Sequence, residues 1–322
     1  MNRLMKLLLL FFTLFSVLQA KEASYNPSSS KGKVETELIS FTYNNGREVP
    51  LKIYLPQDKS ASVILLSHGL GGSREVGAYL GNHWAGRGFV VVAMQHVGSD
   101  ESVWKDVPRL QRMRAMKKAA GGTSFLDRTR DVSATLDQLE KWAADKKHFL
   151  HGRMNLEKIG LGGHSFGALT TQALCGQSFG IREPRFADKR IDAGLALSPS
   201  IPKRGDAKKA FSGIKLPMML MTGTKDTGYI GGATPETRQE VYTALSPGSK
   251  YELVLKDAEH MAFSDRTLKG KEQRNPNHHR AIKALSTSFW EAYLKDSKSA
   301  RTWLDGKKPR GLLAAEDLWH HK

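Results

Sequence analysis

The stretch Leu156-Glu-Lys-Ile-Gly-Leu-Gly-Gly-His-Ser-Phe-Gly-Ala-Leu-Thr-Thr171 decides the fold predicted for this chain. Ile159 to Gly162 has the apolar character of a short buried strand, and Ala168 to Cys175 that of a following helix. Between them, residues 163–167 read G-H-S-F-G, which is typical of the sharp strand-to-helix turn called a nucleophile elbow. Glycine suits both ends of this turn because a side chain there would collide with the neighbouring backbone. We expect the turn to hold the Ser165 hydroxyl clear of the backbone, at the positive end of the helix dipole.

The same five residues would also fit a plain Gly-Ser turn, so the rest of the chain has to support the interpretation. Apolar runs that suit strands alternate with stretches that suit helices. The expected strands are 34–43, 49–55, 62–67, 88–93, 159–162, 193–198, 216–222 and 250–255, and the expected helices include 74–87, 168–175, 235–245 and 281–294. This alternation predicts an α/β fold with a mostly parallel central sheet and helices on both faces. Because parallel strands end at one edge, the loops that follow them should gather beside Ser165. These loops span 68–72, 198–200 and 223–226.

The two ends of the chain carry different signals. Residues 1–20 are predicted to be a signal peptide, because a short basic region precedes an almost unbroken apolar run from Leu7 to Leu18. An uncleaved membrane anchor is the alternative. We expect residues 21–33 to form a disordered lead and residues 34–322 a single catalytic domain. The protein is therefore expected to be exported, either periplasmic or secreted, without an integral membrane segment after processing.

Composition limits the possible partners. The chain has 49 Lys and Arg against 32 Asp and Glu, a formal net charge of +17. The basic residues are scattered and no nucleic-acid motif accompanies them, so we expect no nucleic-acid partner. Attraction to an anionic surface or polymer fits better, and a generally solvated basic surface fits better still. Cys175 is the one cysteine, which excludes an internal disulfide and favours a role in buried packing. A monomer is expected.

A serine nucleophile needs a base, and the base needs an orienting carboxylate. In folds with this elbow the chain order is serine, acid, histidine. Asp226 follows an apolar strand and His260 follows the next one, so these two residues are the predicted partners of Ser165. Asp257 and Glu259 are alternative carboxylates, although both are so close to His260 in sequence that an in-line arrangement is harder.

Three other histidines compete for the role of base. His278 and His279 precede a helix and do not follow a strand, and His164 is expected to pack under the elbow. The adjacent pair His278 and His279 does not have the spacing of a metal site, and neither an H-E-x-x-H sequence nor paired cysteines are present. We therefore expect no metal and no cofactor.

The glycine-rich loop His68-Gly-Leu-Gly-Gly-Ser73 follows a buried strand. Such a loop lets backbone N–H groups point into a site, and the residue after the nucleophile supplies another. The N–H groups of Leu70 and Phe166 are accordingly the predicted oxyanion donors. Gly69 and Ser200 are predicted to contact substrate. A simple glycine turn before a helix is the alternative for the loop.

Residues 95–124 form a long, basic, methionine-bearing segment. A connection of this length in a compact domain is usually functional or partly helical. It either lies over the site and shapes the substrate pocket or forms a surface helix with one apolar stripe.

Several segments resemble those of a known family. They are SHGLGGSREVGAYLGNHWAGRGFVVV, HVGSDESVW, IGLGGHSFGALTT, LALSPS, MTGTKDT and DAEHMAF, and they lie within residues 34–294. The chain resembles the α/β-hydrolase superfamily, specifically bacterial predicted dienelactone hydrolases related to platelet-activating-factor acetylhydrolases and secreted cutinase-like polyester-cleaving enzymes. The resemblance implies an α/β-hydrolase fold, a triad of Ser165, Asp226 and His260, and oxyanion donors at Leu70 and Phe166.

The chain also departs from these relatives. Dienelactone hydrolases use a cysteine where this chain has Ser165, so lactone specificity is not implied. Polyester-cleaving enzymes usually have an aromatic residue in place of Leu70, a tryptophan near Ser200 and a C-terminal disulfide, all of which are missing. We expect an exported serine carboxylesterase that acts on small-molecule or polymeric esters. The alternatives are an amidase, lipase or phospholipid acyl hydrolase with the same triad, or an inactive hydrolase fold that binds an anionic polymer.

Overall fold

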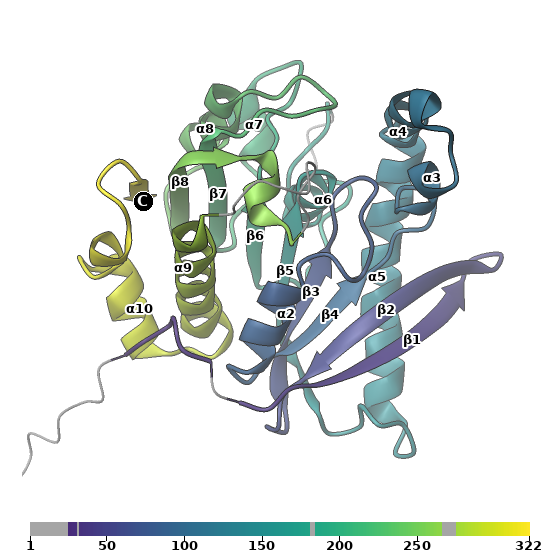
Figure 1. Cartoon of the computed structure of the whole chain (residues 1–322). Helices are drawn as coiled ribbons and strands as arrows, with labels where there is room; N and C mark the ends of the chain where they lie inside the picture. The colour runs from purple at the N-terminus through teal and green to yellow at the C-terminus, as the bar shows by residue number, and fades with distance from the viewer. Residues whose placement is uncertain (1–24, 31, 181–183, 266–274) are drawn as a thin grey trace, which may run out of the picture.

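A mixed sheet runs through the middle of the molecule (Figure 1). The computed structural model describes residues 25–30, 32–180, 184–265 and 275–322. Within them the strand order is β1-β2-β4-β3-β5-β6-β7-β8-β9. The strands are β1 Glu35–Tyr43, β2 Arg47–Leu55, β3 Ala61–Ser67, β4 Val90–Met94, β5 Met154–His164, β6 Ala193–Leu197, β7 Met218–Lys225, β8 Lys250–Glu259 and β9 Leu318–His321. Strands β3 to β8 are parallel, whereas β1, β2 and β9 pair antiparallel at the edges. The mostly parallel sheet confirms the predicted fold class.

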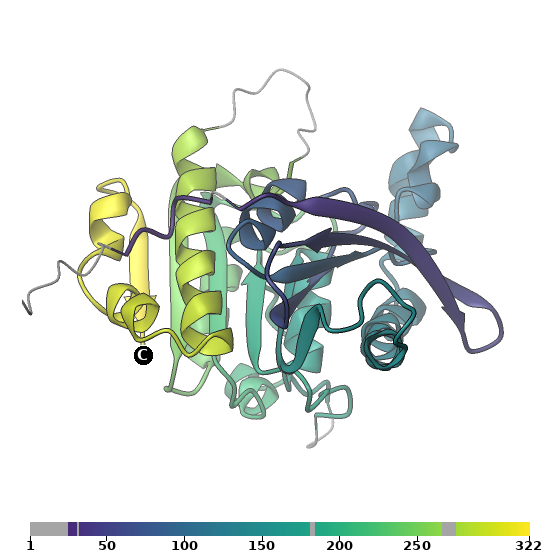
Figure 2. The same ribbon diagram turned by 90° about the horizontal axis from the view of Figure 1, so that it is seen from below.

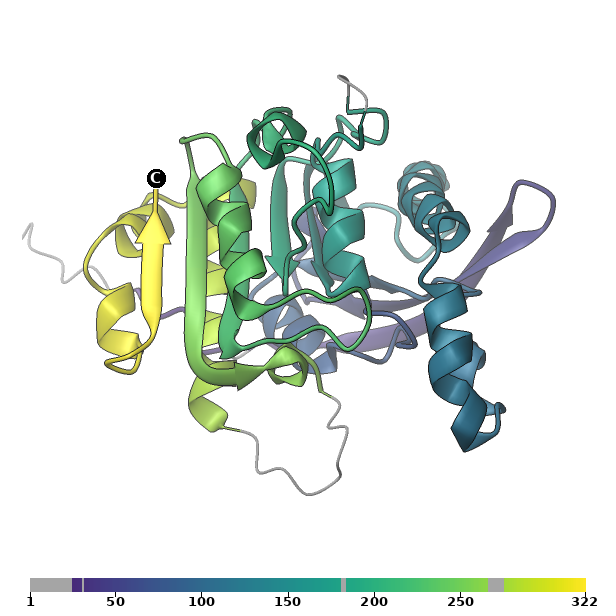
Figure 3. The same ribbon diagram turned by 90° about the horizontal axis from the view of Figure 1, so that it is seen from above.

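Helices cover both faces of this sheet, as Figure 3 shows from above. The α-helices are α2 Ala78–Ala85, α3 Ser102–Lys105, α4 Arg112–Ala119, α5 Gly122–Ala144, α6 Phe166–Leu174, α7 Ala207–Phe211, α8 Pro235–Ala244, α9 Pro276–Leu294 and α10 Lys298–Asp305. Three 3-10 helices are η1 Arg109–Gln111, η2 His260–Phe263 and η3 Pro309–Leu312. Buried residues of α5 to α8 join one core cluster, and those of α2, α9 and α10 join another. The two cores lie on opposite faces of the sheet.

The central strands show why both faces are covered. Val63 and Leu65 of β3 belong to the core under α5 and α6, whereas Ile64 and Leu66 belong to the core under α2 and α9. Successive side chains of a strand point to opposite faces, so an unbroken apolar run needs helices on both sides. Cys175 is a buried free thiol beside the first of these cores, as its sequence position suggested.

Two segments differ from their expected form, and a third lies outside the described residues. The helix expected at 74–87 is shorter, because α2 begins at Ala78 after the left-handed Gly77. The tail after Lys307 carried little signal, yet it contributes β9 beside β8. Residues 1–20, the predicted signal peptide, lie outside the described residues. Among the described helices, none is both long and apolar enough to cross a membrane.

Part of the lead predicted at 21–33 is described, and it lies along the surface of the domain (Figure 2). The hydroxyl of Tyr25 donates a hydrogen bond of 2.6 Å to the carboxylate of Glu291 on α9. The N–H of Gly32 donates to the carbonyl of Gly86 at the end of α2, at 3.1 Å. Residues 21–24 and 31 lie outside the described residues, and the disorder of the lead stays a prediction.

The elbow has the tight geometry that its sequence predicts. A Cβ atom at Gly167 would overlap the carbonyl oxygen of Ser67, and one at Gly163 would overlap the carbonyl of Gly167. The backbone carbonyls of a strand or a helix cannot move aside as a flexible side chain would. The glycines therefore allow α6 to start directly against β3 and β5.

Replacing Gly167 with alanine is expected to lower the free energy of unfolding by at least about 3 kcal/mol, because the new methyl group meets backbone. Gly162→Ala is the matched control, since a Cβ there would lie 3.7 Å from its nearest neighbour. That control should stay within about 1 kcal/mol of the wild type. Urea unfolding followed by circular dichroism measures both. Equal stability of the two variants would contradict the packing described for the elbow.

Candidate active site

Ser165 occupies the turn between β5 and α6. Its backbone φ of 57° and ψ of −111° lie outside the regions that non-glycine residues normally adopt. Such strain persists only where the surrounding structure imposes it, and it is common at functional sites. Ser165 immediately precedes the first turn of α6, whose free N–H groups and dipole favour negative charge nearby.

The structure brings Ser165, His260 and Asp226 into one line. The Nε2 atom of His260 lies 2.9 Å from the Oγ of Ser165, and its Nδ1 atom lies 2.7 Å from Oδ1 of Asp226. His260 is the first residue of η2, directly after β8, and Asp226 directly follows β7. Both distances are within hydrogen-bond range. The carboxylate can hold the Nδ1 proton of the ring, which leaves Nε2 free to accept the serine proton.

Asp226 is fully buried and remains ionised. Burial by itself raises the pKa of this carboxyl group, but the hydrogen bond from His260 and the nearby Arg238 guanidinium outweigh burial and lower it. The hydroxyl of Thr222 donates to Oδ2 at 2.9 Å, so both carboxylate oxygens have partners. A buried carboxylate with all its acceptors used is fixed in orientation.

The competing residues lie elsewhere. Asp257 is exposed and forms an ion pair of 2.9 Å with Lys225, and Glu259 is exposed as well. His278 and His279 contact the backbone carbonyls of Lys256 and Ala262 through Nε2. The sequence left these residues open as alternatives for the acid and the base. In the structure, Asp226 and His260 are the acid and the base that contact each other.

His164 packs beneath the elbow, as expected. Its Nε2 lies 3.0 Å from the carbonyl oxygen of His260, and the two rings are 4.8 Å apart. Burial, together with the neighbouring His260, lowers the pKa of His164 to about 3. His164 is thus a neutral donor that supports the backbone of His260.

The glycine-rich loop adjoins the nucleophile. A Cβ atom built at Gly69 would lie 3.5 Å from the Cβ of Ser165, so this loop passes directly beside the elbow. The Gly71 N–H donates to the carbonyl of Ser99, and the Trp104 indole donates to the carbonyl of Gly71, at 2.9 and 2.8 Å. The backbone of the loop is therefore fixed, and Leu70 lies between its anchored residues. The use of its N–H and that of Phe166 as oxyanion donors stays a prediction.

Residues 34–118 match the family described as platelet-activating factor acetylhydrolase, isoform II. No curated protein matches the chain. The chain is similar to an ester-hydrolysing family of α/β hydrolases. The matched residues include the glycine-rich loop and end before Ser165, so the family match supports the fold and the reaction class, while the roles of Ser165, Asp226 and His260 depend on the geometry above.

The acetylhydrolase-like segment also carries residues that the sequence reasoning did not single out. His96 follows β4 as His68 follows β3, and it lies between Ser67 and Asp131, with Nε2 2.8 Å from the serine Oγ and Nδ1 2.9 Å from the carboxylate. The backbone N–H of His96 donates to Nε2 of His68 at 3.0 Å. A histidine two residues after the buried strand β4 was the available signal. This network ties the strand ends on which the loop is mounted.

Arg128 of α5 completes the support for the loop. Its guanidinium is fully buried, donates to the carbonyl of His68 at 2.6 Å, and lies 4.5 Å from the ring centre of Phe166. It therefore contacts both segments that hold the predicted oxyanion donors. Helical spacing could not reveal it, because a buried arginine on a helix has the same sequence pattern as an exposed one.

Ser200 lies at the end of a loop that α6 holds in place. The side chain of Gln172 accepts from the N–H of Ser200 at 2.9 Å and donates to its carbonyl at 2.8 Å. Ser200 is half-buried and lies in the loop after β6. It is therefore at the same edge of the parallel sheet as Ser165, which follows β5. Its contact with substrate, like that of Gly69, stays a prediction.

The long segment 95–124 is largely helical, through α3, η1 and α4. A Cβ atom at Gly71 would meet Trp104 of α3 and Met116 of α4, so this segment packs on the glycine-rich loop. Leu110 and Met113 on its outer side are exposed. The contact is compatible with a role beside the site, and an effect on substrate choice stays a prediction.

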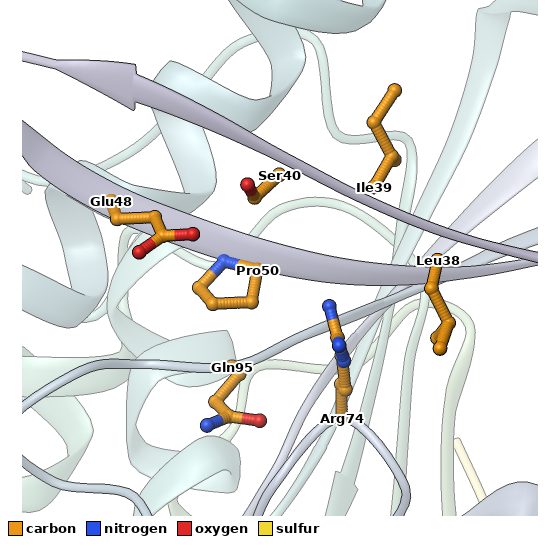
Figure 4. Close-up of a pocket in the computed structure, with 7 residues that line it drawn as sticks. All are labelled: Leu38, Ile39, Ser40, Glu48, Pro50, Arg74 and Gln95. Atoms are coloured by element: carbon orange, nitrogen blue, oxygen red, sulfur yellow. The ribbon is translucent and has the colours of Figure 1, made fainter.

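A shallow pocket lies over β1 and β2, apart from this arrangement (Figure 4). Arg74 and Gln95 also line it, and none of the predicted site residues is among its lining. Among the described residues, no group of three or more His, Cys, Asp or Glu is arranged to hold a metal ion. We assign the pocket no part in the reaction.

Three buried histidines predict how stability depends on pH. Burial lowers the pKa of His83 and His96 to about 4 and that of His164 to about 3. In the unfolded chain they would bind protons below about pH 6.5, whereas in the folded protein they stay neutral to about pH 4. Unfolding therefore takes up protons in this window, and the free energy of unfolding falls as the pH drops from about 6.5 to 4.

Each such histidine contributes a slope of roughly 1.4 kcal/mol per pH unit within that window. Urea unfolding at several pH values measures the total slope. His83 belongs to α2 and its ring contacts the carbonyl of Pro27 in the lead segment. The variant His83→Gln should make the slope shallower by about one proton. Stability that is constant between pH 6.5 and 4.5 would contradict the neutral, buried state of these rings.

Proposed function

We propose that the protein is an exported serine carboxylesterase that works through an acyl-enzyme intermediate. The observation that carries the proposal is the line formed by Ser165, His260 and Asp226, with contacts of 2.9 and 2.7 Å. The family match of residues 34–118 supports ester hydrolysis as the reaction class.

In the first half of the proposed reaction, Nε2 of His260 takes the proton of Ser165 while the serine oxygen attacks the ester carbonyl. The backbone N–H groups of Leu70 and Phe166 stabilise the oxyanion that forms. His260 then gives its proton to the departing alcohol. Asp226 stabilises the imidazolium throughout and keeps the ring oriented.

In the second half, a water molecule takes the place of the alcohol. His260 removes a proton from this water, which attacks the acyl carbonyl. His260 then returns the proton to the Oγ of Ser165 as the bond to the acyl group breaks, which releases the carboxylic acid and restores the free serine and the neutral histidine. No step needs a cofactor. The rigid loop around Gly69 and the half-buried Ser200 would border the substrate.

The preferred acyl group is proposed from the family description, which names an acetylhydrolase. We propose short acyl esters as the substrate class. The same triad would serve a lipase, a phospholipid acyl hydrolase or an amidase, and a hydrolase fold without activity could bind an anionic polymer through the net charge of +17.

A panel of nitrophenyl esters from acetyl to palmitoyl, with the matching anilides, separates these alternatives. The proposal expects the highest kcat/KM with acetyl or butyryl esters and little anilide cleavage. A maximum at long chains would indicate a lipase, and comparable anilide cleavage an amidase. No turnover of any ester would contradict the proposal and favour the binding protein.

Export is proposed from residues 1–20, which precede the described structure. Fractionation of the native host, followed by N-terminal sequencing, tests it. We expect a mature protein that starts near Lys21 outside the cytoplasm. Full-length protein in the cytoplasm would contradict export without affecting the proposed reaction.

A further inference from the structure

A second buried arginine, Arg238, lies next to the proposed triad. It is in the first turn of α8, which begins at Pro235 after the capping residue Thr234. Arg238 is 2% exposed. A buried guanidinium is costly unless its donors are used, so each contact that it makes indicates what keeps it there.

Arg238 joins the ends of three parallel strands. Its NH1 group donates to the carbonyls of Ser198 and Pro199, both at 2.8 Å, in the loop after β6. Its Nε lies 2.9 Å from both the backbone carbonyl oxygen and Oδ1 of Asp226, after β7. Its NH2 lies 3.2 Å from Nδ1 of His260, after β8. One side chain therefore fixes the spacing of the loops that carry the acid and the base.

The contacts at Asp226 also determine which charges surround His260. Oδ1 lies within hydrogen-bond distance of both His260 and Arg238, while Oδ2 accepts from Thr222. A guanidinium has donors and no acceptor, so it cannot accept the Nδ1 proton of His260. When His260 takes the proton of Ser165, it becomes a cation 3.2 Å from another cation. Arg238 thus opposes the charge that Asp226 favours.

We propose that Arg238 is a positioning residue for the relay, which fixes the loops of Asp226 and His260 and limits how readily His260 holds a positive charge. The inference rests on the proposed roles of Ser165 and His260. It assigns to Arg238 two separable effects, one on geometry and one on charge.

Within the part of the chain that the structure describes, the other groups around His260 supply no comparable cation. His164 from β5 is neutral, because burial lowers its pKa to about 3. The Tyr229 ring from the loop after β7 lies edge-on at 5.9 Å. On β8, which directly precedes His260, Asp257 is paired with Lys225 in an exposed ion pair, and Glu259 is exposed to solvent, which screens its charge.

Two variants separate the effects of Arg238. Arg238→Lys keeps a positive charge but loses the planar set of donors, and Arg238→Gln keeps a donor but loses the charge. The wild type and each variant are titrated with a fluorophosphonate that labels Ser165, so that kcat refers to reactive sites. The pH dependence of kcat/KM is then measured with nitrophenyl acetate.

Arg238→Lys is expected to lower kcat per labelled site by about tenfold or more with KM within about twofold, because small displacements of catalytic groups are costly. Arg238→Gln is expected to move the acid limb of the kcat/KM profile to higher pH by about half a unit or more. The sign follows because His260 would hold its proton to higher pH once the opposing cation is gone, and a protonated base is inactive.

Arg190→Met is the matched control. Arg190 also bonds several partners, and these are Asp137, Glu140 and Asp188, away from Asp226 and His260. This variant is expected to lose stability and to keep both kcat per labelled site and the acid limb.

The outcomes are decisive for whichever variant folds. An unchanged kcat per labelled site in Arg238→Lys would overturn the positioning effect, and an unmoved acid limb in Arg238→Gln would overturn the charge effect. If both readouts stayed at their wild-type values, Arg238 would act on folding alone. A wild type that does not react at Ser165 would instead contradict the proposed function.

Discussion

Replacing Ser165 with alanine is expected to lower kcat by about 10⁶-fold, the loss seen when a nucleophile of this type is removed. The reason is that no other group in the line from Asp226 through His260 can attack the ester carbonyl. Steady-state hydrolysis of nitrophenyl acetate by the purified variant measures the loss. The residual rate reports what binding and the oxyanion donors achieve without a nucleophile.

The fold should tolerate this change. Ser165 has φ of 57°, and alanine has the same Cβ as serine, so the strain of the turn is unaltered. Circular dichroism and the thermal midpoint should therefore match the wild type within a few degrees. A well-folded Ser165→Ala protein that retains most of its esterase activity would contradict the assignment of the nucleophile.

Replacing Asp226 with asparagine is expected to lower kcat by about 10⁴-fold, because an amide no longer holds the proton on Nδ1 of His260. The His260 ring would then turn or change tautomer, and Nε2 would no longer accept the proton of Ser165. The loss of negative charge also leaves the Arg238 guanidinium without its ionised partner at 2.9 Å. We therefore expect a loss of stability of about 3 kcal/mol in addition to the loss of activity.

Asp257→Asn is the matched control for this variant. Asp257 is one of the two alternative carboxylates near His260, the other being Glu259, and it is exposed in an ion pair with Lys225. Removing an exposed ion pair should change stability by less than about 1 kcal/mol and leave kcat unchanged. A larger loss of kcat in Asp257→Asn than in Asp226→Asn would reverse the assignment of the acid.

Much of the fold was predictable because its signals are local. Continuous apolar runs such as 62–67 and 88–93 indicate strands buried on both faces, and the glycines at 163 and 167 indicate the tight start of α6. The tail strand β9 was not predictable, because its four residues pair at an edge and carry no apolar run. The packing of Tyr25 on Glu291 was equally hidden, since it joins residues from opposite ends of the chain.

The candidate site, like the fold, was predictable from the sequence in part. Chain order and position after strands were sufficient to select Ser165, Asp226 and His260 as residues that would meet. The arginines that support them could not be selected, because Arg128 and Arg238 lie within helices whose spacing does not distinguish a buried guanidinium from an exposed one. Their burial is a consequence of carbonyls and carboxylates brought together by distant strands.

Labelling with a fluorophosphonate, followed by peptide mapping, tests the central claim most directly. If His260 and Asp226 activate Ser165, the folded protein should take up one label per chain at Ser165, and the heat-denatured protein none. The His260→Ala variant should react far more slowly than the wild type. Failure of the folded, purified protein to label at Ser165, or labelling that survives denaturation or the loss of His260, would contradict the account.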